Sequence, residues 1–240
     1  KYIVNYQNQQ KITFKERKAL FKRNTLKNVI IRILIKLRLI FREDLAFLEK
    51  KYLQNLEKKQ INAFDIDQVC KNKKMIFFAL HMQPELTTSL LGENYEDQIL
   101  ALEKLSLFAK DEWVIIVKDH PSQSSYQRND FFFKRLNLLK NVYFIDRKLD
   151  TETIIKKSNL VATIGGTIGV EALYFSKKCL IFGSCWYQNF VGIFRVKDKT
   201  TSEEINEFIN THVESDKFIK DLNSLLSLCE DGVVYSYYNS

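Results

Sequence analysis

Two short polar clusters, each containing one of the chain's two prolines, hold the residues best suited to chemistry. The first reads Leu80-His81-Met82-Gln83-Pro84-Glu85, and the second reads Lys118-Asp119-His120-Pro121. Because proline fixes its own φ and keeps the preceding residue out of the α region, Gln83 and His120 are expected in extended backbone just beyond a strand. Imidazole, ammonium and carboxylate groups in such a place can transfer protons and bind an anion. The two clusters are therefore candidate ligand-binding loops.

The second cluster has the groups that binding of a phosphate would need. His120 could donate a hydrogen bond to phosphate and stabilise a leaving group. Lys118 could neutralise the phosphate charge, and Asp119 could orient the imidazole. The alternative is an ordinary loop in which Lys118 points outward and stays solvated. Both interpretations stay open at this stage.

The first cluster offers a second set of polar groups within a very short segment. His81 is a hydrogen-bond donor or acceptor, Gln83 supplies an amide, and Glu85 supplies a carboxylate. Glu85 could act as a general base or hold a sugar hydroxyl. The alternative is an acidic residue at the start of a helix that completes the turn at Pro84.

A glycine-rich segment, Gly165-Gly166-Thr167-Ile168-Gly169, is followed closely by Glu171. Glycines permit close approach of the backbone, and amide groups at a helix start attract phosphate. Glu171 could accept hydrogen bonds from ribose hydroxyls. Taken alone, the segment fits a tight strand-to-helix turn better. Its spacing is neither the Gly-x-Gly-x-x-Gly fingerprint nor a Gly-Lys-Ser/Thr phosphate loop, which argues against NAD chemistry and ATP hydrolysis.

The segments between these motifs predict an α/β fold. Short apolar runs predict strands at residues 75–80, 113–117, 142–145, 160–164 and 179–182. Helical spacing predicts helices at residues 95–110, 131–139, 151–157 and 170–175, and further helices near the end of the chain. A capping box is predicted at Thr201 and Glu204. Repeated strand–helix order indicates a Rossmann-like parallel sheet with flanking helices, so the three motifs should meet at the carboxyl edge of the sheet.

Composition and charge narrow the class of protein. The chain has 240 residues, of which 45% are hydrophobic and 28% charged, as in globular proteins. Its net charge of +8 is uneven, because residues 1–60 hold 16 Lys and Arg against 5 Asp and Glu. Residues 1–10 are polar, so we expect no signal peptide there. The positive end is predicted to be a separate electrostatic module.

Within that module, residues 29–41 form an apolar stretch interrupted by Arg32, Lys36 and Arg38. The stretch is too short and too charged to span a bilayer. A helix here would combine a basic stripe with a broad apolar face. Packing on the domain is the first interpretation, and contact of residues 11–60 with an anionic membrane surface is the second. Nucleic acid is not an expected partner, because no motif that reads nucleic acid is present.

The four cysteines give no sign of a metal centre. Cys70, Cys179, Cys185 and Cys229 show no Cys-x-x-Cys spacing and no accompanying histidine cluster. We expect reduced, mostly buried thiols in a cytoplasmic protein, with no cofactor and no metal.

The two proline clusters, with Thr87-Thr88 after the first, resemble bacterial capsular polysaccharide biosynthesis proteins, including the β-Kdo glycosyltransferases of capsule assembly. The segment from Gly166 to Leu173, and Phe182-Gly183 followed by Tyr187, carry the same resemblance. The similarity covers roughly residues 74 to 190. Each motif is weak by itself, and their order and spacing together are fairly specific.

The resemblance implies the donor-binding half of a GT-B-like glycosyltransferase of capsule synthesis. It would transfer a sugar, with CMP-Kdo as the leading donor, to a glycan or glycolipid acceptor. His120 would stabilise the phosphate leaving group, with Glu85 as the second catalytic candidate. His81 and Gln83 would line the donor or acceptor cleft. The candidate donor-binding residues are Lys118, Pro121, Gly165, Gly166, Thr167, Gly169 and Glu171.

One departure from the GT-B pattern affects the expected domains. Residues 1–73 do not supply a complete first Rossmann-like domain, so we divide the chain into a basic helical segment, 1–73, and a nucleotide-sugar-binding domain, 74–240. We then expect the acceptor domain to be missing, together with any catalytic base that it would supply. The expected location is cytoplasmic and peripheral at the inner membrane. Transfer is expected to be metal-independent. The alternatives are a CMP-sialic acid, UDP-sugar or CDP-glycerol transferase, or a non-catalytic nucleotide-sugar-binding module.

Overall fold

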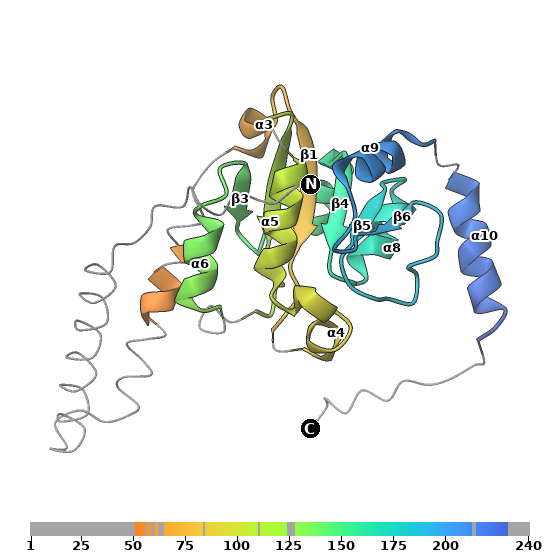
Figure 1. Ribbon diagram of the computed structural model, residues 1–240, viewed down its shortest axis with the longest axis horizontal. Helices are drawn as coiled ribbons and strands as arrows, with labels where there is room; N and C mark the ends of the chain where they lie inside the picture. Colours follow the sequence, from red (N-terminus) through yellow and green to blue (C-terminus); the bar gives the residue numbers. More distant parts are fainter. Residues whose placement is uncertain are drawn as a thin grey trace, which may run out of the picture. The chain divides into compact units, whose positions relative to one another are not determined.

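The computed structural model describes residues 51–55, 57–58, 61, 65–83, 85–109, 111–123, 128–212 and 215–229 (Figure 1). The chain divides into two units, Lys1–Tyr52 and Leu53–Ser240, and the elements named below belong to the second. The expected basic helix, residues 29–41, lies outside the described residues, as does most of the 11–60 segment. The division at residue 73 stays a prediction.

The second unit is built on a six-stranded sheet whose strands all pair in parallel (Figure 1). The strands are β1 (Lys74–Ala79), β2 (Trp113–Lys118), β3 (Val142–Ile145), β4 (Leu160–Thr163), β5 (Cys179–Ile181) and β6 (Ile193–Arg195). Their order across the sheet is β3-β2-β1-β4-β5-β6. This is the order of a Rossmann-like sheet, so the predicted fold class is confirmed.

Helices connect and flank the strands. They are α3 (Ile66–Val69), α4 (Leu86–Ser89), the 3-10 helix η2 (Glu93–Glu96), α5 (Gln98–Phe108), α6 (Asp130–Leu136), α7 (Thr151–Lys157), α8 (Ile168–Tyr174), α9 (Ser202–Asn210) and α10 (Ser215–Leu226). Asn129 and Asp150 accept hydrogen bonds that cap α6 and α7. The predicted capping box of Thr201 and Glu204 is present at the start of α9.

The sequence misses two details of this fold. The predicted helix at residues 95–110 is divided into η2 and α5, because Tyr95 (ψ 16°) and Asp97 (ψ 90°) leave helical geometry. Strand β6 is not predicted, because it has only three residues, all half-buried, and no alternating pattern.

The sheet separates two apolar layers. In β1, Ile76 and Phe78 face the layer that α5, α6 and α9 cover, whereas Met75 and Phe77 face the layer of α7, α8 and α10. All four side chains are at most 2% exposed. A strand buried on both faces reads as a continuous apolar run, which explains why the sequence predicts it so clearly.

The carboxyl ends of the three central strands lie level with one another. Ala79 at the end of β1 pairs with Lys118 of β2 on one side and with Thr163 of β4 on the other. The chain runs outward from β1 to β2 and β3, and then crosses to β4 on the opposite side. The gap between β1 and β4 is therefore the topological switch point, where open α/β sheets bind ligands.

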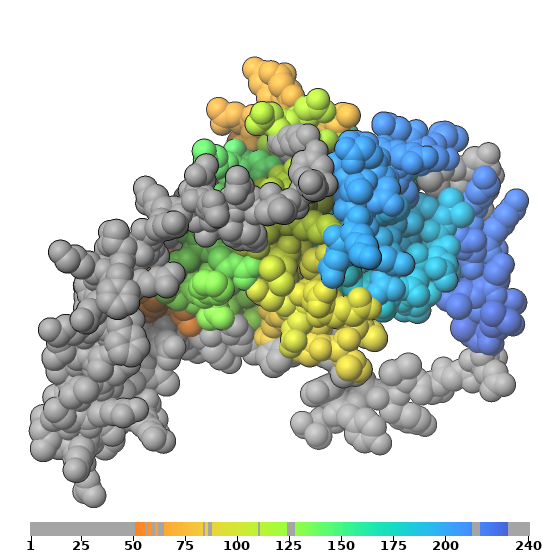
Figure 2. All heavy atoms as spheres, viewed as in Figure 1, coloured from red at the N-terminus to blue at the C-terminus, as the bar shows by residue number. Residues whose placement is uncertain are grey.

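The connection after β1 also meets the connections around β5 and β6 at the surface, where yellow and light-blue atoms adjoin (Figure 2). The amide of Ser184 donates to the carbonyl of Leu91 at 2.8 Å, and Asn94 Nδ2 donates to Asp198 Oδ2 at 2.8 Å. Among the described residues, no helix has the length and apolarity needed to cross a membrane.

Candidate functional site

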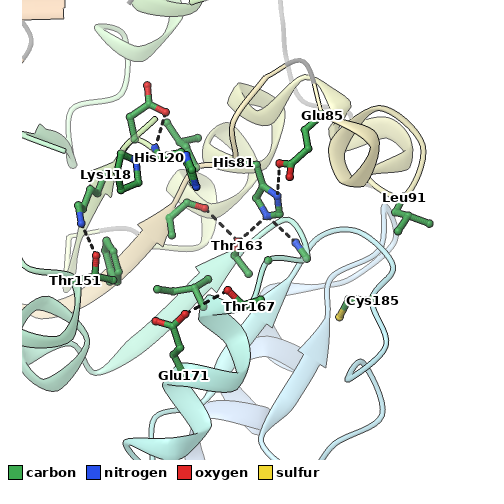
Figure 3. Close-up of a pocket in the computed structure, with 18 of the residues that line it drawn as sticks. His81, Glu85, Leu91, Lys118, His120, Thr151, Thr163, Thr167, Glu171 and Cys185 are labelled. Carbon is green, nitrogen blue, oxygen red and sulfur yellow. Dashed lines mark hydrogen bonds and ion pairs between the residues drawn. The ribbon is translucent and has the colours of Figure 1, made fainter. Parts of the chain in front are cut away.

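A cavity of about 580 Å³ opens at the switch point, beyond the carboxyl ends of the central strands (Figure 3). A volume of roughly 300–1,000 Å³ is usual for a site that holds a small molecule or cofactor. Most of the predicted site residues line it: His81, Glu85, Lys118, His120, Pro121, Gly165, Gly166, Thr167 and Glu171. The three motifs thus share one cavity.

Gln83 and Gly169 do not line this cavity. The side chain of Gln83 donates to the carbonyl of Glu96 at 2.6 Å and accepts from Arg128 Nη1. Gly169 lies against the buried ring of Tyr187, and a Cβ there would come within 2.5 Å of the Tyr187 hydroxyl. Both residues take part in packing around the site instead of facing the cavity.

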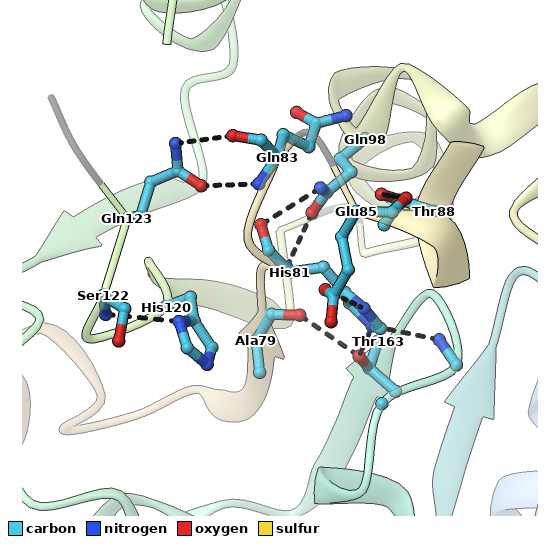
Figure 4. A network of polar contacts seen from close by, with 12 residues as sticks. Ala79, His81, Gln83, Glu85, Thr88, Gln98, His120, Ser122, Gln123 and Thr163 are labelled. Carbon is cyan, nitrogen blue, oxygen red and sulfur yellow. Dashed lines mark hydrogen bonds and ion pairs between the residues drawn. The ribbon is translucent and has the colours of Figure 1, made fainter. Parts of the chain in front are cut away.

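The His81 ring is buried between the ends of β1 and β4 (Figure 4). Its Nε2 accepts a hydrogen bond from the Gly165 amide at 3.2 Å and lies 3.1 Å from Thr163 Oγ1. A backbone amide can only donate, so the ring proton is on Nδ1, which lies 3.9 Å from Glu85 Oε2. Burial lowers the pKa of His81 to about 4, although the Glu85 carboxylate opposes this effect. His81 is therefore neutral near pH 7.

Glu85 stands at the entrance to α4, with its side chain 40% exposed. Its backbone carbonyl accepts from Ser89 N at 2.9 Å, and from both the amide and the hydroxyl of Thr88. The carboxylate faces the Nδ1–H side of His81 on the cavity wall (Figure 3). It is placed to accept a proton from a hydroxyl group bound in the cavity.

His120 is exposed and lines the same cavity, near Lys118 (Figure 3). Its Nδ1 accepts from the Ser122 amide at 3.2 Å, so the neutral ring carries its proton on Nε2 (Figure 4). Asp119 does not orient the imidazole as expected, because its Oδ1 accepts from the backbone amide of His120 at 2.9 Å. The carboxylate thus fixes the backbone of the loop, and the Ser122 amide orients the ring.

Lys118 ends β2, a strand in which every residue is buried. The alternative in which Lys118 points outward and stays solvated is wrong: the residue is 5% exposed, lines the cavity and donates from Nζ to Thr151 Oγ1. Burial lowers the pKa of Lys118, and the carboxylates of Asp150 and Glu171 oppose this effect. The site thus has an ammonium group in a largely dry position, where its attraction for an anion is strong.

The glycine-rich loop forms the floor of the cavity. Gly166 packs on the His81 ring, where an added Cβ would lie 3.0 Å from Nε2. Its carbonyl accepts from the hydroxyl of Tyr187, a buried phenol whose pKa is raised by burial, so the hydroxyl stays a donor. Within the described residues, the amides of Gly166, Thr167 and Ile168 have no hydrogen-bond acceptor, as is usual at a helix start. All three residues line the cavity.

Two further cavity residues are not singled out by the sequence. Trp186 is 56% exposed, and its ring lies edge-on to Tyr187 (5.2 Å) and Phe190 (5.6 Å). Thr151 holds the Lys118 ammonium. The sequence contains this tryptophan, but its place at the cavity depends on the β5–β6 connection, which the sequence pattern does not predict.

Acidic and basic side chains both line the cavity. The carboxylate residues that line the cavity are Glu85, Asp119 and Glu171, and Thr167 Oγ1 donates to Glu171 Oε1 at 3.3 Å. The basic side chain of the site is Lys118. In the part of the chain that the structure describes, no group of three or more His, Cys, Asp or Glu residues is arranged to hold a metal ion.

Comparisons with solved structures find partial likenesses. The β-Kdo 2,7 transferase KpsC of Thermosulfurimonas dismutans is 14% identical (82% of this chain, 67% of that chain, TM-score 0.40). The β-Kdo 2,4 transferase of the same name and organism is 16% identical (71% and 56%, TM-score 0.44). The UDP-GlcNAc 2-epimerase of Methanocaldococcus jannaschii is 14% identical (72% and 50%, TM-score 0.46). The chain thus spans about half to two thirds of the length of these proteins.

A search of the curated proteins finds no match. The family model described as "Capsule polysaccharide biosynthesis protein" matches residues 34–226, which is most of the chain and includes every residue that lines the cavity. The chain therefore belongs to the capsule polysaccharide biosynthesis protein family.

Proposed function

We propose that this chain is the donor-binding part of a glycosyltransferase in capsule polysaccharide synthesis. Its cavity would hold a nucleotide-activated sugar, with CMP-Kdo as the favoured donor, for transfer to a glycan or glycolipid acceptor. One observation carries the proposal: the His120 ring, the Lys118 ammonium and the amides of the glycine-rich loop line the same cavity at the switch point. The family of the chain supports the same pathway of synthesis.

The phosphate of the donor would lie between His120, Lys118 and the loop amides. During transfer, the bond between the sugar carbon and the phosphate oxygen breaks, and negative charge collects on the phosphate. Hydrogen bonds from His120 Nε2–H and from the amides of Gly166 and Thr167 would stabilise that charge, together with Lys118. Electrostatic stabilisation of this kind is commonly the largest single contribution to catalysis.

The nucleoside would extend toward α8 and the β5–β6 connection. Glu171 lines the cavity and its Oε1 accepts from Thr167, so its other oxygen could accept from ribose hydroxyls. Trp186 offers an exposed aromatic face at the rim for the base.

Glu85 would take the proton of the acceptor hydroxyl as its oxygen attacks the sugar carbon. The neutral Nδ1–H of His81 faces this carboxylate and would keep it directed at the cavity. His81 thereby acts as a positioning residue, and Glu85 as the base. Lys118 supplies positive charge at the phosphate and His120 supplies a hydrogen bond, so we propose that no metal ion is needed for donor binding.

The remaining proposals concern residues 1–73. Residues 1–60, with 16 Lys and Arg against 5 Asp and Glu, would place the protein at an anionic membrane surface on the cytoplasmic side. Co-sedimentation with two types of vesicle, one of neutral lipid alone and one that also contains anionic lipid, tests this directly. Equal sedimentation with both vesicle types, or none with either, would rule the membrane role out.

The function itself is tested by calorimetric titration of the full chain with CMP, UDP and CDP, with and without a chelator. We expect CMP to bind most tightly and the chelator to leave its affinity unchanged. His120→Ala should weaken CMP binding by about 10- to 100-fold, the value of one charge-assisted hydrogen bond. His212→Ala, at an exposed histidine outside the cavity, is the matched control. Equal CMP affinity of His120→Ala and wild type would refute the role of His120.

A further inference from the structure

A buried charge pair beside the cavity, Arg128 with Asp119, is given no role in the function proposed above. Arg128 and Asp119 are each 2% exposed, and Arg128 does not line the cavity. Arg128 Nη2 donates to Asp119 Oδ1 at 2.8 Å, and Nε donates to Asp119 Oδ2 at 3.3 Å. The pair is bidentate, which fixes the guanidinium and the carboxylate in one plane.

Arg128 also reaches the other proline cluster. Its Nη2 donates to the carbonyl of His81 at 2.7 Å, and its Nη1 donates to Gln83 Oε1. The guanidinium carbon lies 5.1 Å from the centre of the Phe132 ring, which covers it. One planar group therefore joins the loop after β1 to the loop after β2. Lysine could not reproduce this set of contacts, because its ammonium is a compact point charge on a flexible stem.

The contacts of Asp119 lead from this pair to the cavity. Asp119 Oδ1 accepts from Arg128 and also from the backbone amide of His120 at 2.9 Å. Arg128 thus fixes the orientation of the Asp119 carboxylate, and that carboxylate in turn holds the backbone amide of His120. Arg128 also donates to the backbone carbonyl of His81, and the ring of His81 accepts a hydrogen bond from the Gly165 amide.

We infer that Arg128 is a positioning residue that acts through Asp119 to hold His120 at the cavity. The effect of Arg128 on nucleotide binding rests on the proposed function, whereas its effect on the loop that carries His120 does not. The two effects can be measured separately.

The first measurement uses nucleotide-free protein and follows hydrogen exchange of the His120 backbone amide by NMR. We expect Arg128→Lys to speed this exchange at least tenfold, while the amide of Ile116 in the centre of β2 is unchanged. Arg135→Lys is the matched control, because Arg135 of α6 pairs with Glu103 of α5 through two hydrogen bonds of 2.7 Å and does not line the cavity. Unchanged exchange at His120 in Arg128→Lys would overturn the inference, whether or not nucleotide binds.

The second measurement is a cycle of CMP affinities for wild type, Arg128→Lys, His120→Ala and the double variant. We expect Arg128→Lys to weaken binding about tenfold in the wild-type background and to have no effect when His120 is absent. Equal losses in both backgrounds would indicate a general structural role and overturn the inference. If wild type does not bind CMP, the proposed function fails and the exchange measurement alone decides. If Arg128→Lys does not fold, Asp119→Asn takes its place in the exchange measurement, with the same expected result.

Discussion

The imidazole of His81 accepts a hydrogen bond from the Gly165 amide, 84 positions further along the chain and 3.2 Å away. This contact joins the end of β1 to the glycine-rich loop after β4. It also fixes the ring tautomer, which leaves the Nδ1–H directed at Glu85. A single neutral histidine thus connects the floor of the cavity to its candidate base.

The first prediction concerns the dependence of stability on pH. The ordinary pKa of the imidazole is 6.5, which we take for the unfolded chain, and in the folded protein the pKa of His81 is about 4. Between these pH values the unfolded chain binds more protons, so stability falls as the pH is lowered from about 6.5 to about 4. The shift corresponds to about 3 kcal/mol in the free energy of unfolding.

Urea unfolding of wild type and His81→Gln at about pH 7 and about pH 4 measures this contribution. The glutamine can still accept from an amide, but it does not titrate. We expect wild type to lose about 3 kcal/mol more than the variant over this range. Equal losses in the two proteins would show that His81 does not have a lowered pKa.

The second prediction concerns the packing of the glycine-rich loop. Gly169→Ala should destabilise the protein by about 1–3 kcal/mol, because the new Cβ would lie 2.5 Å from the hydroxyl of the buried Tyr187. Gly165→Ala is the comparison, since its Cβ would meet its nearest atom at 3.2 Å, the carbonyl oxygen of Ser184. In thermal unfolding, Gly169→Ala should have a clearly lower midpoint temperature than Gly165→Ala. The reverse order would contradict the described position of Tyr187.

The third prediction separates binding from stability at Lys118. Lys118→Met removes a buried charge whose pKa is lowered by burial, so the variant should unfold at the same or a higher urea concentration. Its affinity for CMP should nevertheless fall by about 10- to 100-fold, because the phosphate loses a cation in a largely dry site. Lys148→Met, at an exposed lysine that does not line the cavity, serves as the control in both measurements. Loss of stability without loss of affinity would assign Lys118 to the structure alone.

The fourth prediction concerns the aromatic rim. Trp186→Ala should weaken CMP binding by about 5- to 100-fold, as expected when one base loses an aromatic ring on which it stacks. Tyr174→Ala is the control, because Tyr174 is 74% exposed and does not line the cavity. Binding of CMP should also change the fluorescence of wild type, in a way that Trp186→Ala loses. Unchanged affinity in Trp186→Ala would place the base elsewhere.

The sequence predicts most of this fold because its central strands are buried on both faces. Segments such as Met75 to Leu80 appear as unbroken apolar runs, and the polar residues that follow them must gather at one edge of a parallel sheet. This argument alone places His120, Lys118 and the glycine-rich loop together.

The contacts between these loops are not predictable in the same way. Arg128 has no motif around it, and its acceptors come from two different loops. The role of His81 depends on an amide 84 positions away. Spacing along the chain indicates which residues share an edge, but side-chain pairing across that edge depends on rotamers and on burial.

The position of β1 between β2 and β4 also has a consequence for synthesis of the chain. β1 pairs with β2 soon after both emerge, but its other neighbour, β4, begins only at Leu160. Until then β1 is an edge strand with an apolar sequence, which is open to pairing with other chains. The cavity floor does not exist before β4 and the glycine-rich loop are in place. A nascent or truncated chain that ends before residue 160 should therefore aggregate readily, and no nucleotide can rescue it, because its binding site is completed last.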